Sequence, residues 1–266
     1  MINLVLERIQ LFLLDMDGTF YLGDDLLPGA LDFVETIREQ GKRFLFLTNN
    51  SSKDSRQYVA KLRRLGVHVD IEDVFTSGEA TAIFTKYRYG NARVFVIGTQ
   101  SLVKTFEEYG HIVTNVDPQV VILGYDTEIN YEKLSLGCLF IRKGLDYIAT
   151  HPDINCPSSQ GPLPDAGSFI ALIEKSTGRK PDFIIGKPNP LMLQMIVEKT
   201  GVKPEQIAMV GDRLYTDMEF AKRSGILSIL VLSGESSLDD LAKVEQKPDL
   251  VLQNIGELAS ILKRKV

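Results

Sequence analysis

The sequence predicts an α/β fold in which a doubly wound parallel sheet is interrupted by a smaller, inserted α/β domain. Short runs of nearly continuous apolar residues recur along the chain, which is typical of strands covered on both faces of a parallel sheet. Segments with helical spacing separate these runs, and alternating strands and helices indicate βαβ units. Polar residues suited to chemistry cluster in 15–19, 48–51 and 186–217, so the long middle of the chain stands apart.

Apolar runs followed by turn residues predict the strands. There are ten of them: "LFLLDMDG" (11–18), "RFLFLTNNS" (43–51), "VFTSG" (74–78), "RVFVIGT" (93–99), "VVILGYD" (120–126), "DYIATHPD" (146–153), "DFIIGKPN" (182–189), "IAMVGDR" (207–213), "LSILVLSG" (227–234) and "PDLVLQN" (248–254). These strands could form one broad sheet or two smaller ones.

Helical spacing closed by a glycine predicts the helices between the strands. "ALDFVETIREQG" is expected to end at Gly41, and "NPLMLQMIVEKTG" at Gly201. The apolar stripes of "YEKLSLGCLFIRKG" (131–144) indicate a packed helix rather than a cofactor site.

The polar clusters also predict the domain organisation. Residues 1–78 and 183–266 are expected to form one split core domain, and residues 79–182 an inserted α/β domain. The glycine-containing segments 77–80 and 178–182 are the predicted hinges.

Composition excludes several classes of partner. A net charge of −5 over 266 residues offers no basic surface for nucleic acid. The cysteines, Cys138 and Cys156, are too few for a disulfide scaffold, so we expect a reducing cytoplasm. Glu7, Arg8 and Asp15 break up the N-terminal apolar residues, which argues against a signal peptide, and no apolar run approaches the length needed to cross a membrane.

Four predicted strands end in polar groups that are energetically costly to place at the edge of a buried strand. In chain order these are Asp15 with Asp17, Thr48 with Asn49 and Asn50, Lys187, and Asp212 with Asp217. Each group alone could be an ordinary turn, a helix cap or a surface residue. Together they indicate one site, because ligands of open parallel sheets bind at the carboxyl ends of the strands.

The residue types at these strand ends suit a divalent cation and a phosphate. Asp15, Asp212 and Asp217 would repel one another unless a hard cation lay between them, and oxygen ligands favour Mg²⁺. Thr48 could donate its hydroxyl to a phosphate oxygen, and Lys187 could neutralise negative charge on a phosphoryl group. The pair Asp15 and Asp17 could then supply a nucleophile and a proton-transfer group.

At this point the motifs resemble those of a known family. "DMDGT" (15–19), "TNNS" (48–51), "GKPNP" (186–190) and "GDRLYTDM" (211–218) are similar, in order, to the four motifs of the haloacid dehalogenase superfamily. The insertion between the second and third motifs resembles the C2-type (IIA) cap of its phosphatases, and "TNN", "ATHPD" and "GKP" look most like the p-nitrophenyl phosphatase, phosphoglycolate phosphatase and pyridoxal phosphatase relatives. The resemblance covers the whole chain and implies a Rossmann-like core.

The resemblance implies a role for each carboxylate. Asp15 would be the nucleophile that forms an aspartyl-phosphate, and Asp17 the general acid and base. The side chains of Asp15 and Asp212 and the main-chain carbonyl of Asp17 would bind Mg²⁺. Asp217 would lie near the metal, either as a direct ligand or through water and Lys187.

The resemblance also implies how substrate is held. Thr48 and Lys187 would bind the phosphoryl group, Asn49 would contribute its main-chain amide, and Asn50 is a further candidate for substrate binding. One departure touches the cap, where Asp165 in "PDAGS" (164–168) replaces a glycine frequent in relatives.

The expected function is a Mg²⁺-dependent phosphatase of small phosphorylated metabolites, such as a sugar phosphate, a nucleoside monophosphate or phosphoglycolate, with p-nitrophenyl phosphate as an artificial substrate. Alternatives are a phosphotransferase or mutase using the same intermediate, and a non-catalytic sensor of phosphorylated ligands. We expect no nucleic-acid or membrane partner, and a homodimer through the cap is left open. The polar cap loop at Asp153, Asn155 and 157–161 either contacts substrate or faces solvent.

Overall fold

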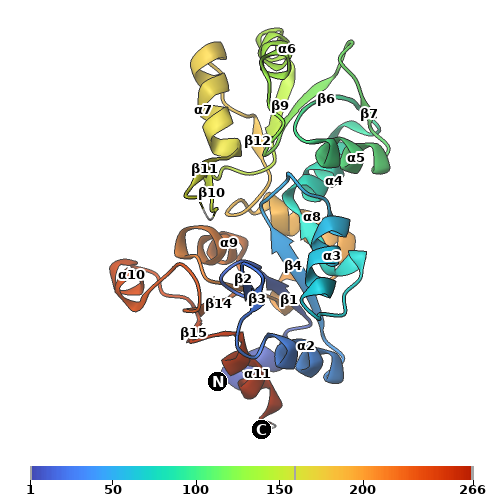
Figure 1. The fold of residues 1–266 in the computed structure, drawn as a ribbon. Helices are drawn as coiled ribbons and strands as arrows, with labels where there is room; N and C mark the ends of the chain where they lie inside the picture. The colour runs from blue at the N-terminus through green and yellow to red at the C-terminus, as the bar shows by residue number, and fades with distance from the viewer. Residues whose placement is uncertain (1, 159, 265–266) are drawn as a thin grey trace. The chain divides into compact units, whose positions relative to one another are not determined.

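The computed structural model describes residues 2–158 and 160–264 of the chain. It divides into two compact units (Figure 1). Unit 1 consists of Met1–Thr48, Val59–Phe75 and Pro188–Val266, and unit 2 of Asn49–Tyr58 and Thr76–Lys187. Residue 159, which belongs to the predicted polar cap loop, lies outside the described residues.

Unit 1 is built on a six-stranded sheet with the strand order β15-β14-β13-β1-β4-β5. The strands are β1 (Leu11–Leu14), β4 (Arg43–Thr48), β5 (Val74–Thr76), β13 (Ile207–Gly211), β14 (Leu227–Val231) and β15 (Leu250–Leu252). β1 pairs in parallel with β4 and with β13, and β13, β14 and β15 continue the parallel arrangement. β1 and β13 are buried along their whole length, which explains their unbroken apolar sequences.

The strand order places a topological switch beside β1. The chain passes from β1 to β4 and β5 in one direction, and later returns to β13 on the other side of β1. Leu14 pairs with Val210, and the N–H of Asp15 donates to the Val210 carbonyl at 2.9 Å. The residues that follow β1 and β13 therefore meet at the carboxyl edge where such sheets bind ligands.

Helices flank the sheet of unit 1. They are α1 (Ile2–Arg8), α2 (Ala30–Glu39), α8 (Leu191–Thr200), α9 (Glu219–Ser224), α10 (Leu238–Lys243) and α11 (Ile255–Lys263), with short helices η1 (Ile71–Asp73), η2 (Pro204–Gln206) and η3 (Leu214–Met218). Although α2 and α11 come from opposite ends of the chain, they lie side by side (Figure 1, blue and red). α3 (Ser55–Arg64) is shared between the units.

Unit 2 contains a five-stranded sheet with the order β12-β9-β8-β6-β7, in which all neighbouring strands are parallel. Its strands are β6 (Arg93–Ile97), β7 (Ile112–Val113), β8 (Val120–Leu123), β9 (Asp146–Ala149) and β12 (Phe183–Ile184). Its helices are α4 (Ser77–Tyr89), α5 (Gln100–Glu108), α6 (Tyr131–Arg142) and α7 (Ala166–Thr177). α6 and α7 stand next to each other and cover a core that includes Phe95, Leu123 and Tyr147 (Figure 1).

The predicted α/β fold with parallel sheets is confirmed, and every predicted strand is present. The strands form two larger sheets rather than one. Helices α2 and α8 end at the predicted places, where Gly41 and Gly201 have positive φ angles of 66° and 69°. The segment 77–80, predicted as a hinge, forms the first turn of α4, and β12, predicted to belong with the core, pairs with β9 of unit 2.

The antiparallel hairpins were not predicted. One joins β2 (Tyr21–Leu22) to β3 (Asp25–Leu26), and the other joins β10 (Asn155–Cys156) to β11 (Leu163–Pro164). No helix in the described part of the chain is long and apolar enough to cross a membrane.

Candidate active site

An acidic cluster lies at the switch point of the sheet in unit 1. Asp15 follows β1, Asp212 follows β13, and Asp217 belongs to η3, which comes directly afterwards. One carboxylate oxygen of each residue lies within 4.8 Å of the others. Asp212 and Asp217 are buried and Asp15 is half-buried. The structure thus brings together the three carboxylates that the sequence proposed as metal ligands.

Glycines allow the main chain to approach these carboxylates closely. A Cβ atom on Gly18 would lie 2.5 Å from Oδ2 of Asp212, and one on Gly234 only 2.0 Å from the same oxygen. A Cβ on Gly211 would lie 2.4 Å from the Asp217 carboxylate. Real side-chain contacts are not this short, so a larger residue at any of these positions would displace the Asp212 or Asp217 carboxylate.

Main-chain and hydroxyl donors orient Asp212. The Thr19 hydroxyl donates to Oδ1 at 3.1 Å, and the N–H of Glu235 donates to Oδ2 at 2.7 Å. Burial, and then the negative charge of Asp15, raise the pKa of Asp212 to about 6, although these donors oppose the shift. The Asp217 carboxylate accepts from the N–H of Arg213 at 3.2 Å. Burial lowers the pKa of Arg213, but the surrounding aspartates raise it overall.

This donor set fits Mg²⁺. It consists of oxygen atoms only, which hard cations prefer, and it concentrates negative charge in a mostly buried place. Burial of like charges is costly without compensating positive charge. The Arg213 guanidinium supplies part of it for the three aspartates, and a bound cation would supply the rest.

Asp17 lies just beyond Asp15 in the turn that leads to the β2–β3 hairpin. It forms an isolated bridge with Tyr21, and the N–H of Gly18 donates to the Tyr21 carbonyl at 2.8 Å. Gly18 has a φ of 86°, which allows the chain to turn sharply here. Although the residue as a whole is exposed, desolvation of its carboxyl group raises the pKa of Asp17, against the lowering effect of Lys61.

The remaining predicted residues fall on both sides of a unit boundary. Thr48 ends β4 in unit 1, and Asn49 is the next residue and the first of unit 2. Lys187, the last residue of unit 2, is only 2 % exposed. The Asn49 Nδ2 donates to the Lys187 carbonyl at 2.8 Å, so the structure brings these two residues together within unit 2.

Asn50 differs from the other predicted residues because its carboxamide has a local structural contact. Its Oδ1 accepts hydrogen bonds from the N–H and the hydroxyl of Ser52 at 2.9 and 2.7 Å. This is the geometry of an Asx turn, which shapes the loop between β4 and α3.

The sequence reasoning did not identify some residues of the site. Thr19 and the main chain at Gly234 and Glu235 contact Asp212, and Asp153 accepts from Asn49 in unit 2. Thr19 and Gly211 lie within the quoted motifs 15–19 and 211–218, although neither was singled out there. Gly234 ends the predicted strand segment 227–234 but has no side chain that indicates chemistry. Asp153 was predicted only as part of the polar cap loop, not as a partner of Asn49.

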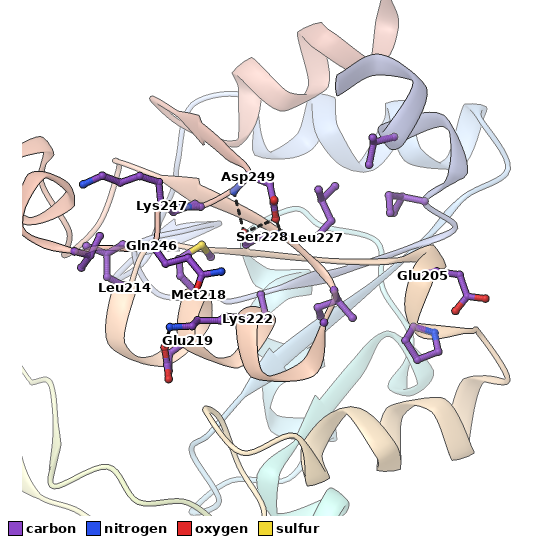
Figure 2. Close-up of a pocket in the computed structure, with 18 of the residues that line it drawn as sticks. Glu205, Leu214, Met218, Glu219, Lys222, Leu227, Ser228, Gln246, Lys247 and Asp249 are labelled. Carbon is purple, nitrogen blue, oxygen red and sulfur yellow. Dashed lines mark hydrogen bonds and ion pairs between the residues drawn. The ribbon is translucent and has the colours of Figure 1, made fainter. Parts of the chain in front are cut away.

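A separate cavity of about 690 Å³ lies in unit 1, and none of the predicted site residues lines it (Figure 2). Its lining includes Leu227 and Ser228 at the start of β14 and Asp249 just before β15. The N–H and the hydroxyl of Ser228 both donate to Asp249 Oδ2, at 2.9 and 2.6 Å. This contact joins the starts of β14 and β15. The acidic cluster lies at the opposite edge of the sheet, where the strands end.

Comparisons with known proteins agree with this geometry. Residues 12–112 match a sequence model described as haloacid dehalogenase-like hydrolase, and residues 184–258 match a second, HAD-hydrolase-like model. The acid sugar phosphatase of Staphylococcus aureus (strain USA300) is 33% identical over 261 residues, which cover 97% of this chain and all of that protein.

Solved structures are similar over nearly the whole chain. The 4-nitrophenylphosphatase of Thermotoga maritima is 57% identical with a TM-score of 0.94, and the match covers 97% of this chain and 99% of that one. NagD from Escherichia coli K-12 is 32% identical with a TM-score of 0.87, covering 94% and 98% of the two chains.

Proposed function

The chain belongs to the haloacid dehalogenase-like hydrolase family, and from this premise we propose that it is a Mg²⁺-dependent phosphatase of small phosphorylated metabolites. Membership confirms the resemblance predicted from the four motifs and the prediction of an enzyme, a hydrolase of the phosphatase class. The substrates named for its relatives, sugar phosphates and 4-nitrophenyl phosphate, support phosphate monoesters as the substrate class.

One observation carries the proposal: carboxylates from Asp15, Asp212 and Asp217 converge within 4.8 Å at the switch point of a parallel sheet. An acidic cluster repels a phosphate ester on its own, so it requires a cation before it can serve phosphoryl transfer. A Mg²⁺ ion would be held by these side chains together with the main-chain carbonyl of Asp17. When bound, it supplies positive charge beside the transferring phosphoryl group.

In the proposed mechanism, Asp15 is the nucleophile. One carboxylate oxygen attacks phosphorus, the bond between phosphorus and the ester oxygen breaks, and an aspartyl-phosphate forms. Asp17 gives its proton to the departing alkoxide and then takes a proton from water, whose oxygen attacks the phosphorus of the intermediate. The bond between phosphorus and Asp15 breaks, which releases inorganic phosphate and restores both carboxyl groups.

The phosphoryl group would be held by Thr48, by the main-chain amide of Asn49 and by Lys187, with Asn50 as a further contact. The motif order supports these roles, because all four residues belong to segments similar to the second and third family motifs. The hydrogen bond between the Asn49 side chain and the Lys187 carbonyl also supports a role for both residues in binding the phosphoryl group.

Unit 2 would act as the cap that selects the leaving group and excludes water. The catalytic core would then be unit 1, and the cap would be the segment Thr76–Lys187 of unit 2 rather than the predicted 79–182, because β12 pairs with β9 in that unit. We propose that the enzyme works in the cytoplasm, because neither Cys138 nor Cys156 forms a disulfide in the described part of the chain, and that the cap can pair with a second copy of the chain.

Phosphate release from a panel of metabolites tests the function. The purified protein should release inorganic phosphate from sugar phosphates and from p-nitrophenyl phosphate only when Mg²⁺ is present. Asp15→Asn should abolish release, whereas Asp24→Asn, which changes an exposed carboxylate of the same unit, should leave it unchanged. Transfer of phosphate to an added sugar without release would favour a phosphotransferase. Saturable ligand binding without turnover would favour a sensor.

A further inference from the structure

The carboxamide of Asn49 joins two segments of unit 2. Its Nδ2 donates to the Lys187 carbonyl at 2.8 Å and to the Asp153 carboxylate, at 3.1 Å to Oδ2 and 3.3 Å to Oδ1. A carboxamide has only two N–H groups. One is therefore committed to Lys187, and the other is shared between the oxygens of Asp153.

Asp153 and Lys187 together determine which way this carboxamide points. If its oxygen and nitrogen changed places, Oδ1 would face the Lys187 carbonyl and the Asp153 carboxylate, and only acceptors would meet. In the described part of the chain, the buried Oδ1 has no hydrogen-bond partner that would hold it from the other side. The charged acceptor strengthens the bond to Nδ2. Asp153 is therefore the main group that fixes the Asn49 side chain toward Lys187.

The main chain around Asn49 is packed so closely that it cannot shift to accommodate a displaced Asn49 side chain. The N–H of Gly186 donates to the Thr150 carbonyl at 2.7 Å. A Cβ on Gly186 would lie 2.7 Å from both Asn49 Oδ1 and the Thr150 carbonyl oxygen. The hydroxyl of Ser77, at the start of α4, donates to the Asn49 carbonyl. The backbone and the side chain of Asn49 are thus both held in place.

The loop that carries Asp153 is itself anchored by buried polar contacts. His151, which is completely buried, contacts Asp165 Oδ1 through Nε2 at 2.9 Å and the Thr150 hydroxyl through Nδ1 at 2.9 Å. The Thr150 hydroxyl also contacts the Ser51 hydroxyl at 2.9 Å. A carboxylate on such a fixed loop is suited to positioning another group rather than to following a variable substrate.

We propose that Asp153 is a positioning residue for the reaction: acting through Asn49, it fixes the main chain of Lys187 and hence the site of the lysine ammonium group. The proposal rests on the proposed function, in which Lys187 binds the phosphoryl group. It assigns Asp153, part of a loop that sequence reasoning offered for substrate specificity, to a role common to all substrates.

A double-mutant cycle between Asp153 and Asn49 tests this role. We would measure kcat and KM of Asp153→Ala, Asn49→Ala and the double variant with Mg²⁺, using p-nitrophenyl phosphate and glycerol phosphate. Each single variant should lose about tenfold to hundredfold in kcat/KM, by the same factor for both esters, because a displaced phosphate-binding group impairs every substrate. The double variant should lose no more than the worse single one, since both remove the same link.

Asp153→Asn provides the conservative comparison. Its carboxamide oxygen can still accept from Asn49, so it should keep activity within about threefold of the parent. Asp117→Asn, an exposed carboxylate of unit 2 that pairs with Arg93, serves as the matched control and should behave like the parent. Thermal unfolding of every variant corrects activity for the folded fraction, so a variant that folds poorly does not imitate the predicted loss.

Additive losses, equal losses in Asp153→Asn and Asp153→Ala, or a loss confined to one ester would each overturn the proposal. So would full activity of Asp153→Ala in an active parent enzyme. A parent protein without Mg²⁺-dependent phosphate release would instead refute the proposed function, and this role with it.

Discussion

Among single residues, the glycines around the acidic cluster are as constrained as the carboxylates. Gly211 and Gly234 need no unusual backbone conformation, yet a Cβ at either position would overlap Asp217 or Asp212. Their value lies in the close approach of the main chain, which places the N–H of Glu235 on the Asp212 carboxylate. Substitution here should damage the site while the sheet below it stays intact.

We predict that Gly234→Ala weakens Mg²⁺ binding and lowers phosphatase activity by about tenfold to hundredfold, the usual effect of disturbing the support of a metal ligand. The reason is displacement of the Asp212 carboxylate, because the new Cβ would lie 2.0 Å from its Oδ2. Titration of Mg²⁺ against turnover and against thermal stability would measure both effects. Leu238→Ala, a change of an exposed side chain in the following helix α10, is the control and should be neutral. Unchanged Mg²⁺ dependence in Gly234→Ala would contradict the assigned metal site.

His111 in unit 2 is a buried histidine whose contacts favour the neutral ring. Its Nδ1 accepts from the N–H of Ala92 at 3.2 Å, and its Nε2 faces the Ala82 carbonyl at 3.0 Å and so carries the proton. The ring of Phe106 lies beside it, and Lys86 is the charged group that acts on it. Burial, with a smaller contribution from Lys86, lowers the pKa of His111 despite these hydrogen bonds.

A lowered pKa in the folded state predicts a loss of stability in acid. Below the unfolded-state pKa of about 6.5 the unfolded chain binds a proton first, so the free energy of unfolding falls by up to ~1.4 kcal/mol per pH unit until the folded pKa is reached. His111→Gln should remove this part of the pH dependence. Urea denaturation at pH 7 and pH 5 measures it, with the exposed His68→Gln as control. Equal pH dependence in the two variants would show that folding does not lower the pKa of His111.

Among elements, the packing of α2 against α11 depends on two facing glycines. Gly29, with a φ of 77°, precedes α2, and a Cβ on it would lie 2.2 Å from the Cα of Gly256 in α11. The residue before α2 and the first turn of α11 are thus in direct backbone contact. Backbone atoms cannot move aside as a flexible side chain can, so the two elements have little tolerance for added volume.

We predict that Gly29→Ala lowers the free energy of unfolding by about 2–5 kcal/mol, from backbone strain and overpacking together. Gly23→Ala separates the two causes, because Gly23 also has a positive φ, 61°, but a Cβ on it would meet nothing within 4 Å. It should cost only about 1–2 kcal/mol. Urea denaturation gives both values. Equal losses of unfolding free energy in Gly29→Ala and Gly23→Ala would mean that the close approach of α2 to α11 does not add to the cost of the Gly29 substitution.

The elements also show where sequence patterns are sufficient. Long apolar runs such as 11–14 and 207–210 predicted their strands because a strand buried on both faces has no polar alternation. β7 and the hairpin strands span only two residues each, which is too short for any periodicity. Residues 183–184 were predicted to belong to the core domain, but β12 pairs with β9 of unit 2, because this pairing is decided by tertiary structure and not by local sequence.

On the scale of the whole molecule, the order of the strands explains which contacts of the site could be predicted from the sequence. Asp15 and Asp212 are far apart in the chain, yet the return of the chain to β13 beside β1 brings them together. The strand-end rule for parallel sheets predicted that meeting. No such rule predicts that Asp153 meets Asn49, because that contact depends on side chains in the loop after β9.

In the proposed mechanism, Asp15 carries the phosphoryl group during turnover. Rapid acid quenching of the enzyme with ³²P-labelled substrate and Mg²⁺, followed by proteolysis and mass spectrometry, locates any phosphorylated residue. We expect a label that is sensitive to hydroxylamine, maps to Asp15, and is absent in Asp15→Asn. Turnover without any label at Asp15, or a label on another residue, would contradict it.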